Sequence, residues 1–138
     1  MSIVKSIKRA YSLLEERNWD KVYWCIDLHG VCLKSTYNEN DNVFYNDSAL
    51  KTLQLISSLP ESVIILWSSC HYDEQSRVRQ LFNDNDINVK YFNENPEISN
   101  TLTGDFTYKF YFSVLLDDKA GFDPDEDWEL IYKYLKNK

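Results

Sequence analysis

VYWCIDLHG, residues 22–30, is the most informative stretch of the chain, because an almost wholly apolar run ends there in a charged side chain. Residues 22–26 combine β-branched and aromatic side chains, which predicts a strand that is buried on both faces. Asp27 follows the run directly, and Gly30 lies in a predicted tight turn just beyond it. We therefore expect a central strand whose carboxyl end carries Asp27.

The rest of the chain alternates between strand and helix patterns. Apolar runs predict three more strands, at 63–67 (VIILW), 89–92 and 114–116. Helical periodicity predicts helices over 2–18, from Asp47 or Ser48 to Pro60, from Asp73 to about Phe82, and after Pro124. Loops are predicted at 34–47, with a small hairpin around Val43–Tyr45, and at 93–105.

This alternation of strands and helices indicates βαβ units. We predict an α/β fold, a three-layer, Rossmann-like domain with a mostly parallel sheet and helices on both faces. A chain of 138 residues is long enough for one such domain, spanning 1–138, and no linker separates a second.

The charge balance narrows the function classes. The chain has 22 acidic and 15 basic residues, a net charge of −7, which disfavours a nucleic-acid partner because phosphate backbones are bound by clustered Lys and Arg. A small phosphorylated substrate stays compatible, since one metal ion and one Lys reverse the local field inside a cleft.

Two further features concern the compartment. No apolar run is long enough to span a membrane, and the N-terminus is no signal peptide, so we expect a cytoplasmic protein without a membrane partner. The three cysteines are odd in number and lack Cys-x-x-Cys spacing, which predicts free thiols.

Polar side chains follow three of the predicted strands at the point where each strand ends: Asp27 to His29, Ser68 with Ser69, and Asp117 with Asp118. Parallel strands bring their carboxyl ends to one edge of the sheet, where ligands bind in open α/β folds. Each group alone is more often a turn or a helix cap. Together, carboxylates that face each other across one edge favour a bound cation, and an oxygen-rich cluster of this kind suits Mg²⁺.

The strand ends, taken in order, resemble the haloacid-dehalogenase-like hydrolases. In that family a hydrophobic strand ends in Asp-x-Asp-x-Thr/Val, a second strand ends in Ser or Thr, a Lys follows, and a later strand ends in paired acids. The matching segments here are WCIDLHGV, VIILWSS, Lys109 and VLLDD, and the resemblance spans about residues 20–135.

The resemblance implies a Mg²⁺-dependent phosphohydrolase whose nucleophile, Asp27, forms an aspartyl-phosphate. It implies that Mg²⁺ is held by Asp27, by the backbone carbonyl of His29, and by Asp117 or Asp118. The ion would neutralise phosphoryl oxygens and let an anionic nucleophile approach an anionic substrate.

The resemblance also implies two contacts to the phosphoryl group. Ser68 would donate a hydrogen bond to it, with Ser69 as the alternative if the strand ends one residue later. Lys109 would stabilise the charge on Asp27 and on the phosphoryl group. Taken alone, Lys109 fits equally well as a surface Lys on a segment rich in Tyr and Phe.

One residue departs from the family pattern. Phosphatases of the family carry a second Asp two positions after the nucleophile, as general acid and base, and this sequence has His29 there. Three interpretations stay open: His29 replaces that Asp, the chemistry differs, or turnover has been lost. A His suits the first interpretation because its reference pKa of about 6.5 lies near working pH.

Two other function classes compete with the hydrolase. A degenerate scaffold would serve as a protein-binding module, since aromatic residues are enriched at protein interfaces. The aromatic residues that suggest such a surface are Tyr37, Phe44, Tyr45, Tyr108 and Tyr111. A receiver-like phosphoacceptor also uses carboxylates and Mg²⁺ at strand ends, but receivers carry their paired acids early in the chain, and here the pair is late.

Overall fold

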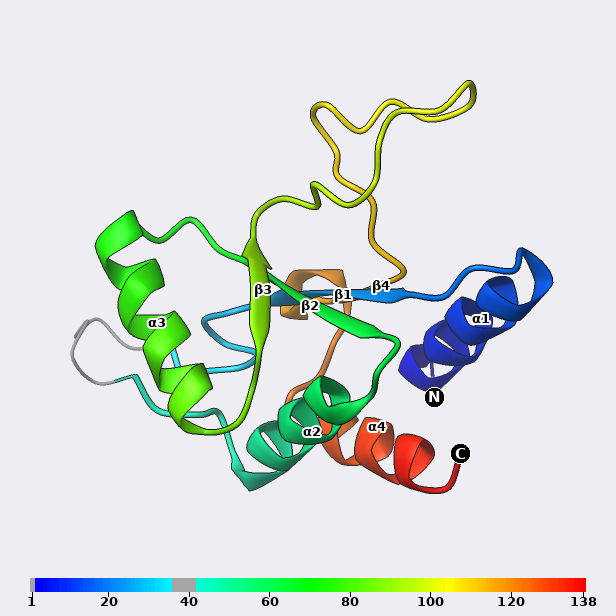
Figure 1. The fold of residues 1–138 in the computed structure, drawn as a ribbon. Coiled ribbons are helices and arrows are strands. Elements are labelled where there is room, and N and C mark those ends of the chain that lie inside the picture. The colour runs from blue at the N-terminus through cyan, green and yellow to red at the C-terminus, as the bar shows by residue number, and fades with distance from the viewer. Residues whose placement is uncertain (1, 36–41) are drawn as a thin grey trace.

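A computed structural model describes residues 2–35 and 42–138, which form a four-stranded parallel sheet with its helices gathered against it (Figure 1). The elements run in the order α1 (Ser2–Glu16), β1 (Val22–Asp27), α2 (Asp47–Ser58), β2 (Ser62–Trp67), α3 (Tyr72–Asp84), β3 (Val89–Phe92), β4 (Val114–Leu116), the 3-10 helix η1 (Asp118–Ala120) and α4 (Asp127–Lys136). The strand order is β3-β2-β1-β4 and all pairs are parallel. The predicted α/β class and parallel sheet are therefore confirmed.

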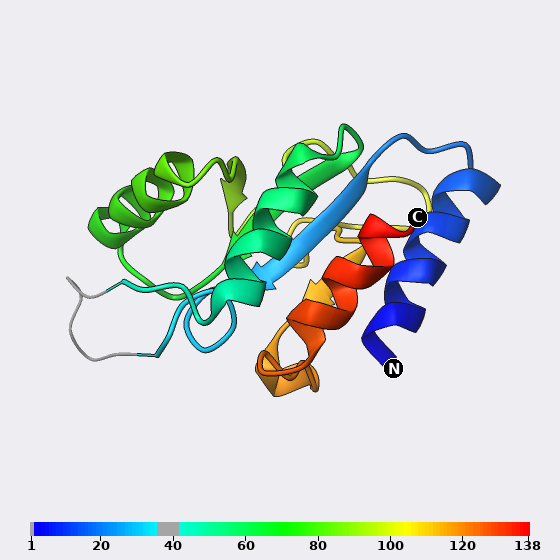
Figure 2. The same cartoon turned by 90° about the horizontal axis from the view of Figure 1, so that it is seen from below.

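One face of the sheet, here called the helix face, builds the main hydrophobic core. Alternate side chains of the strands point to it, as the two-residue period of a strand requires. Figures 1 and 2 show α1, α2 and α4 lying beside one another under this face, with α3 beside β3 at the sheet edge. The buried residues of this core include Ile7, Trp24, Ile26, Leu53, Ile56, Ile64, Leu66, Val78, Phe82, Val114, Leu116, Trp128 and Ile131.

The opposite face, here called the loop face, is covered by residues 93–113 rather than by a helix. Tyr23, Val63 and Ile65 point to this face and pack against side chains of the connecting segment, namely Ile98, Phe110 and Tyr111. Helices were expected on both faces, but on this face the third layer is irregular backbone. Its sequence, with Asn, Thr, Gly and Pro at close intervals, supplies no helical period.

The direction of the connections explains why the two faces differ. The chain steps the same way from β1 to β2 to β3, and right-handed crossovers then put α2 and α3 on one face. From β3 the chain returns past β1 to reach β4, and the same handedness sends that connection over the other face. The sheet order thereby creates a switch point between β1 and β4, the place where open α/β folds bind ligands.

Helix ends differ from the predictions by one or two residues. The N-cap of α2 is Asn46, whose side chain accepts a hydrogen bond from Ala49 N, so neither Asp47 nor Ser48 is the cap. Helix α3 begins at Tyr72 after His71, not at Asp73. Helix α1 ends at Glu16, short of the predicted end, because the chain turns into a left-handed conformation, with φ 55°, at Asn18.

Three smaller predictions concern single features. An antiparallel bridge joins Leu33 to Phe44, but residues 36–41 of that loop lie outside the described residues, so the hairpin expected around Val43–Tyr45 stays a prediction. The cysteines are free thiols, with Cys25 and Cys32 buried. Within the part of the chain that the structure describes, no helix is long and apolar enough to cross a membrane.

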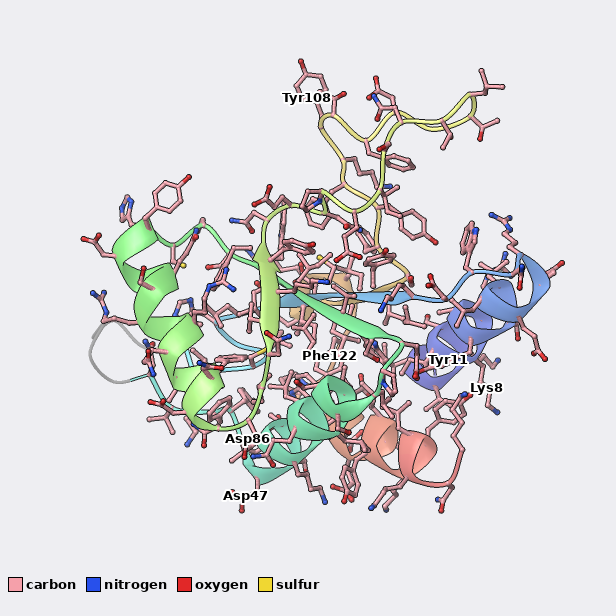
Figure 3. The ribbon with its side chains drawn as sticks, in the orientation of Figure 1. Lys8, Tyr11, Asp47, Asp86, Tyr108 and Phe122 are labelled. Atoms are coloured by element: carbon pink, nitrogen blue, oxygen red, sulfur yellow. The ribbon has the colours of Figure 1, made fainter. Side chains whose placement is uncertain are left out.

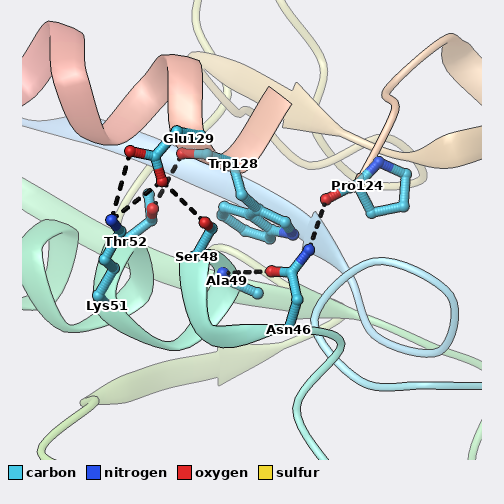
Figure 4. A network of polar contacts seen from close by, with 8 residues as sticks. All are labelled: Asn46, Ser48, Ala49, Lys51, Thr52, Pro124, Trp128 and Glu129. Atoms are coloured by element: carbon cyan, nitrogen blue, oxygen red, sulfur yellow. Dashed lines mark hydrogen bonds and ion pairs between the residues drawn. The ribbon is translucent and has the colours of Figure 1, made fainter. Parts of the chain in front are cut away.

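Polar contacts fix α2 against α4 beneath the sheet (Figure 4). Asn46 both caps α2 and donates to the carbonyl of Pro124, at 3.1 Å, in the turn before α4. Thr52 donates to the carbonyl of Trp128 at 3.0 Å, and Glu129 accepts from Ser48 at 2.8 Å. These hydrogen bonds provide partners for polar groups near the start of each helix and fix the position of α4 against α2. Helix α4 follows the acidic end of β4.

Removal of the Asn46 side chain tests this link. We expect Asn46→Ala to lower the free energy of unfolding by about 1–2 kcal/mol, because a cap and a carbonyl partner are lost together. Asn46→Asp keeps the cap but cannot donate to Pro124, so its loss is expected to be smaller. Urea denaturation measures both, and a change below about 0.3 kcal/mol for Asn46→Ala would contradict the assignment.

Candidate active site

The pairing of β1 on both sides brings the predicted residues to one edge of the sheet. Asp27 lies opposite Trp67 of β2, and Ile26 lies opposite Leu116 of β4, the residue before Asp117. Strand alternation then puts Asp27 and Trp67, which end β1 and β2, and Asp117, which follows β4, on the loop face at the carboxyl ends of the strands. The structure therefore brings together the acids that sequence analysis took from opposite parts of the chain.

The carboxylates of Asp27, Asp117 and Asp118 form one cluster, here called the acidic triad. One oxygen of each lies within 4.8 Å of the others, and all three are at least partly open to solvent. Asp117 caps the short helix η1 by accepting from Lys119 N at 2.9 Å. Asp118 lies close enough to Asp27 to accept a hydrogen bond from its carboxyl group when that group is protonated, so Asp118 reaches back toward the end of β1.

The pKa of Asp27 is raised from 3.8 to about 6, chiefly by burial and in addition by the neighbouring charges of Asp117 and Asp118. Like charges at this separation cannot all ionise without a cost in free energy. The same environment acts on Cys25, whose pKa burial raises to about 12, with Asp117 and Asp27 adding to the shift. This thiol is therefore neutral and is no nucleophile.

The donor set fits a hard divalent cation. Mg²⁺ is bound in proteins by one or two carboxylates while it keeps several waters, and the partly open triad leaves room for such waters. A bound cation would also remove the repulsion that raises the pKa of Asp27. Asp27, Asp117 and Asp118 are thus the described residues that could hold Mg²⁺ at this edge, and the carbonyl of His29 stays a prediction as a ligand.

Gly30 allows the turn after β1 to approach the triad closely. Its φ of 86° is a left-handed conformation that glycine adopts readily, and a Cβ there would lie 3.4 Å from Asp118 Oδ2. The turn is closed by hydrogen bonds from Gly30 N to Leu33 O and from Leu33 N to Leu28 O. The glycine predicted from sequence is therefore favoured by the backbone conformation, while a Cβ there would only be in van der Waals contact with Asp118.

His29 contacts a carboxylate that sequence analysis missed. Its Nε2 lies 3.3 Å from Glu74 Oε1, in the first turn of α3, and both side chains are mostly shielded from solvent. Glu74 carries no motif signal, since an acidic residue in the first turn of a helix is ordinary. Its proximity to His29 arises only when α3 packs beside the end of β1.

Ser68 is held in place by a second residue that sequence analysis missed. The side chain of Asn93 accepts from Ser68 N at 2.8 Å and donates to Ser68 O at 2.6 Å, and Asn93 itself has a left-handed φ of 56°. Ser68 Oγ accepts from Cys70 N at 3.2 Å, which is a turn contact. Ser69 is exposed. An Asn directly after a strand was the available signal for Asn93, because Asn tolerates the left-handed region.

Lys109 lies over the loop face, in the segment that leads to β4. Together with Asp117 it lines a cavity of about 250 Å³ whose other walls are mainly aromatic. Lys109 and one member of the triad thus border the same cavity. Contact between Lys109 and Asp27 stays a prediction.

The aromatic residues proposed for a partner surface behave differently from one another. Phe44 packs on Phe82, and Tyr45 donates to Asp125 at 3.0 Å. Tyr111 makes an edge-to-face contact with Tyr23. Of the four that lie in the described residues only Tyr108 is largely exposed, and it points away from the sheet at the outer bend of its segment (Figure 3), whereas Tyr37 lies outside them.

Comparison with known proteins assigns no family to this arrangement, since no family model, no curated protein and no solved structure matches the chain.

Neutralisation of Asp27 tests the repulsion within the triad. In EDTA at pH 7.5 we expect Asp27→Asn to raise the unfolding free energy by about 1 kcal/mol, after discounting for partial exposure, and the melting temperature by about 3–5 °C. The gain should shrink as pH falls through about 6, because Asp27 of the native protein then becomes protonated in the folded state but not in the unfolded one.

Asp20→Asn is the matched control, since it removes the same charge at an exposed position before β1, away from the triad. It is expected to leave the melting temperature within about 1 °C at either pH. An Asp27→Asn variant that is less stable than the native protein in EDTA would contradict the repulsion.

Proposed function

We propose that the chain is a Mg²⁺-dependent phosphohydrolase of the haloacid-dehalogenase-like type, with Asp27 as its nucleophile. The observation that carries this proposal is the acidic triad, in which the Asp that ends β1 lies within 4.8 Å of the two acids that follow β4. The resemblance requires this meeting of its first and last motifs. The substrate is a phosphate monoester, and the cytoplasm is its expected compartment.

When bound, Mg²⁺ would be held by Asp27, by Asp117 or Asp118, and by the carbonyl of His29, and it would neutralise phosphoryl oxygens. Asp27 pairs with Trp67 and directly follows residues that pair on both sides, so its backbone is held in a fixed position. A fixed nucleophile saves the entropy cost of aligning it with phosphorus.

Asp27 begins the reaction. One oxygen of its carboxylate bonds to phosphorus while the bond from phosphorus to the ester oxygen breaks, and the departing oxygen takes a proton from a general acid. Water then attacks the phosphorus of the aspartyl-phosphate and gives its proton to the same group, while the bond from phosphorus to the Asp27 oxygen breaks. The products are an alcohol and inorganic phosphate, and Asp27 returns to its ionised form.

His29 is the proposed general acid and base. A carboxylate on one ring nitrogen orients an imidazole and fixes which nitrogen carries the proton, and Glu74 lies 3.3 Å from Nε2. Nδ1 is then the nitrogen that exchanges the proton with substrate and water. A positioned group of this kind contributes about 10²–10⁴ in rate.

Ser68 and Lys109 are the proposed phosphoryl contacts. Ser68 Oγ accepts from Cys70 N, which leaves its hydroxyl hydrogen free to donate to a phosphoryl oxygen. Asn93 fixes the backbone of Ser68, so this donor is held at the sheet edge. Lys109 borders the same cavity as Asp117 and supplies positive charge against the phosphoryl group.

The two rival functions have less support. The strand order β3-β2-β1-β4 differs from the order 2-1-3-4-5 of receiver domains, which argues against a receiver-like phosphoacceptor. A protein-binding module on a degenerate scaffold is favoured only by exposed apolar side chains, chiefly Tyr72, Leu102 and Tyr108. If the test of the hydrolase fails, the binding module becomes the favoured function.

Turnover of 4-nitrophenyl phosphate tests the proposal. We expect activity that requires Mg²⁺ and that falls by about 10³-fold or more in Asp27→Asn, because the nucleophile is lost. His29→Ala should lose about 10²–10⁴ in kcat, while Asp20→Asn, with the same charge change as Asp27→Asn, should keep full activity.

His29→Asp separates the remaining interpretations. An inactive native chain that gains activity in His29→Asp would mean an intact site that lacks its acid and base. Undiminished activity in Asp27→Asn would contradict the proposed nucleophile. If neither the native chain nor His29→Asp hydrolyses aryl or alkyl phosphates, the hydrolase is rejected and the binding module is favoured.

A further inference from the structure

A cavity lies beside the acidic triad on the loop face of the sheet. Its floor is formed by Cys25 and Leu115, which are partners in the pairing of β1 with β4, and its edge is formed by Asp117. Because Asp117 belongs to both the triad and the cavity, a phosphate at the triad would direct its ester group into this space. The cavity is therefore the place where the leaving group of the proposed reaction would sit.

The walls of the cavity are aromatic. Trp67 ends β2 and its ring centroid lies 5.6 Å from that of Phe110, which in turn lies 6.1 Å from Phe112. Trp67 stays 46% exposed although it ends a strand of the sheet, so its ring is available for a further contact. Aromatic rings prefer such offset and edge-to-face neighbours, each worth about 0.5–1.5 kcal/mol beyond area burial.

Few polar groups line the space. Lys109 and Asp117 supply its charges, and Tyr108 stands at the rim with its side chain turned outward (Figure 3). A sugar or a peptide backbone next to the phosphate would bury hydroxyl or amide groups against rings that cannot pair with them, at a cost in binding free energy. An aromatic ring has no hydroxyl or amide group that would lose its hydrogen bonds there.

The volume limits the occupant further. Pockets for drug-sized ligands span about 300–1,000 Å³, and this cavity, at about 250 Å³, is smaller. One ring fits that size class better than a nucleoside, which would also place its ribose, not its base, next to the phosphate.

We propose that the cavity lined by Trp67, Phe110 and Phe112 binds an aromatic ring bonded directly to the phosphate oxygen, so that the substrates are aryl phosphate monoesters, of which a phosphotyrosine side chain is one. This inference rests on the proposed hydrolase function. Lys109 stands over the bond between ring and phosphate and attracts the negative charge that develops on the phenolic oxygen as that bond breaks. The ring lies against Trp67.

Binding of phosphonates tests the subsite without any turnover. The chain has four Trp, and only Trp19 and Trp67 are substantially exposed, so indole N–H resonances of the native protein report on this site. With Mg²⁺ present, we expect phenylphosphonate to shift the Trp67 resonance in a saturable way, and methylphosphonate to leave it in place. Trp67→Phe assigns the signal, and Trp19, beyond the other end of β1, is the internal control.

Substrate preference gives the second readout. We expect Trp67→Ala to lower the ratio of kcat/KM for phosphotyrosine to kcat/KM for phosphoserine by about tenfold, the size of one lost aromatic contact. Comparing the ratio between variants cancels the intrinsic difference in leaving-group reactivity. Trp19→Ala, which removes an equally large exposed ring, should leave the ratio unchanged.

The two readouts separate the two proposals. A shift of Trp67 by phenylphosphonate alone, without hydrolysis of any ester, would support the ring subsite and reject the hydrolase. Hydrolysis with an unchanged ratio in Trp67→Ala, or equal shifts from both phosphonates, would support the hydrolase and overturn the subsite.

Discussion

The parallel pairing of β1 with a strand on each side is the constraint on which the rest of the structure depends. Six residues of β1 pair with β2 and three pair with β4, so the positions of their carboxyl ends follow from hydrogen bonding alone. Asp27 then lies beside Asp117 and Asp118, and burial together with the repulsion from these two carboxylates raises its pKa to about 6. The fold holds like charges together at this edge, which is a cost in stability that a bound cation would reverse.

The same strand order accounts for the shape of the site. After β3, at one edge of the sheet, the chain returns to the opposite edge to form β4, and this connection, residues 93–113, crosses the loop face. Because the segment lacks a helical period, it forms irregular backbone above the sheet. A helix would cover the face with a regular stripe of side chains. The irregular segment instead brings Lys109, Phe110 and Phe112 over the end of β1 and leaves a cavity beside the triad.

The strands were predictable to within one residue, because their apolar, β-branched runs are bounded by polar residues and each is buried in one sheet. The triad was also predictable, because the strand ends can be located from the local sequence and parallel strands bring their carboxyl ends to one edge of the sheet. Caps such as Asn46 were missed because several neighbouring polar residues compete for that role. The contacts of Glu74 with His29 and of Asn93 with Ser68 could not be predicted, since the first depends on how α3 packs beside the end of β1 and the second on the pairing of β3 with β2.

Anomalous scattering from a crystal of the native protein soaked in Mn²⁺, a stand-in for Mg²⁺ with the same preference for oxygen ligands, tests the central claim most directly. The account predicts one strong peak within bonding distance of carboxylate oxygens of Asp27 and of Asp117 or Asp118, and no such peak in Asp27→Asn. A crystal with Mn²⁺ bound only elsewhere, or with the three carboxylates unchanged and free of metal at millimolar Mn²⁺, would contradict it.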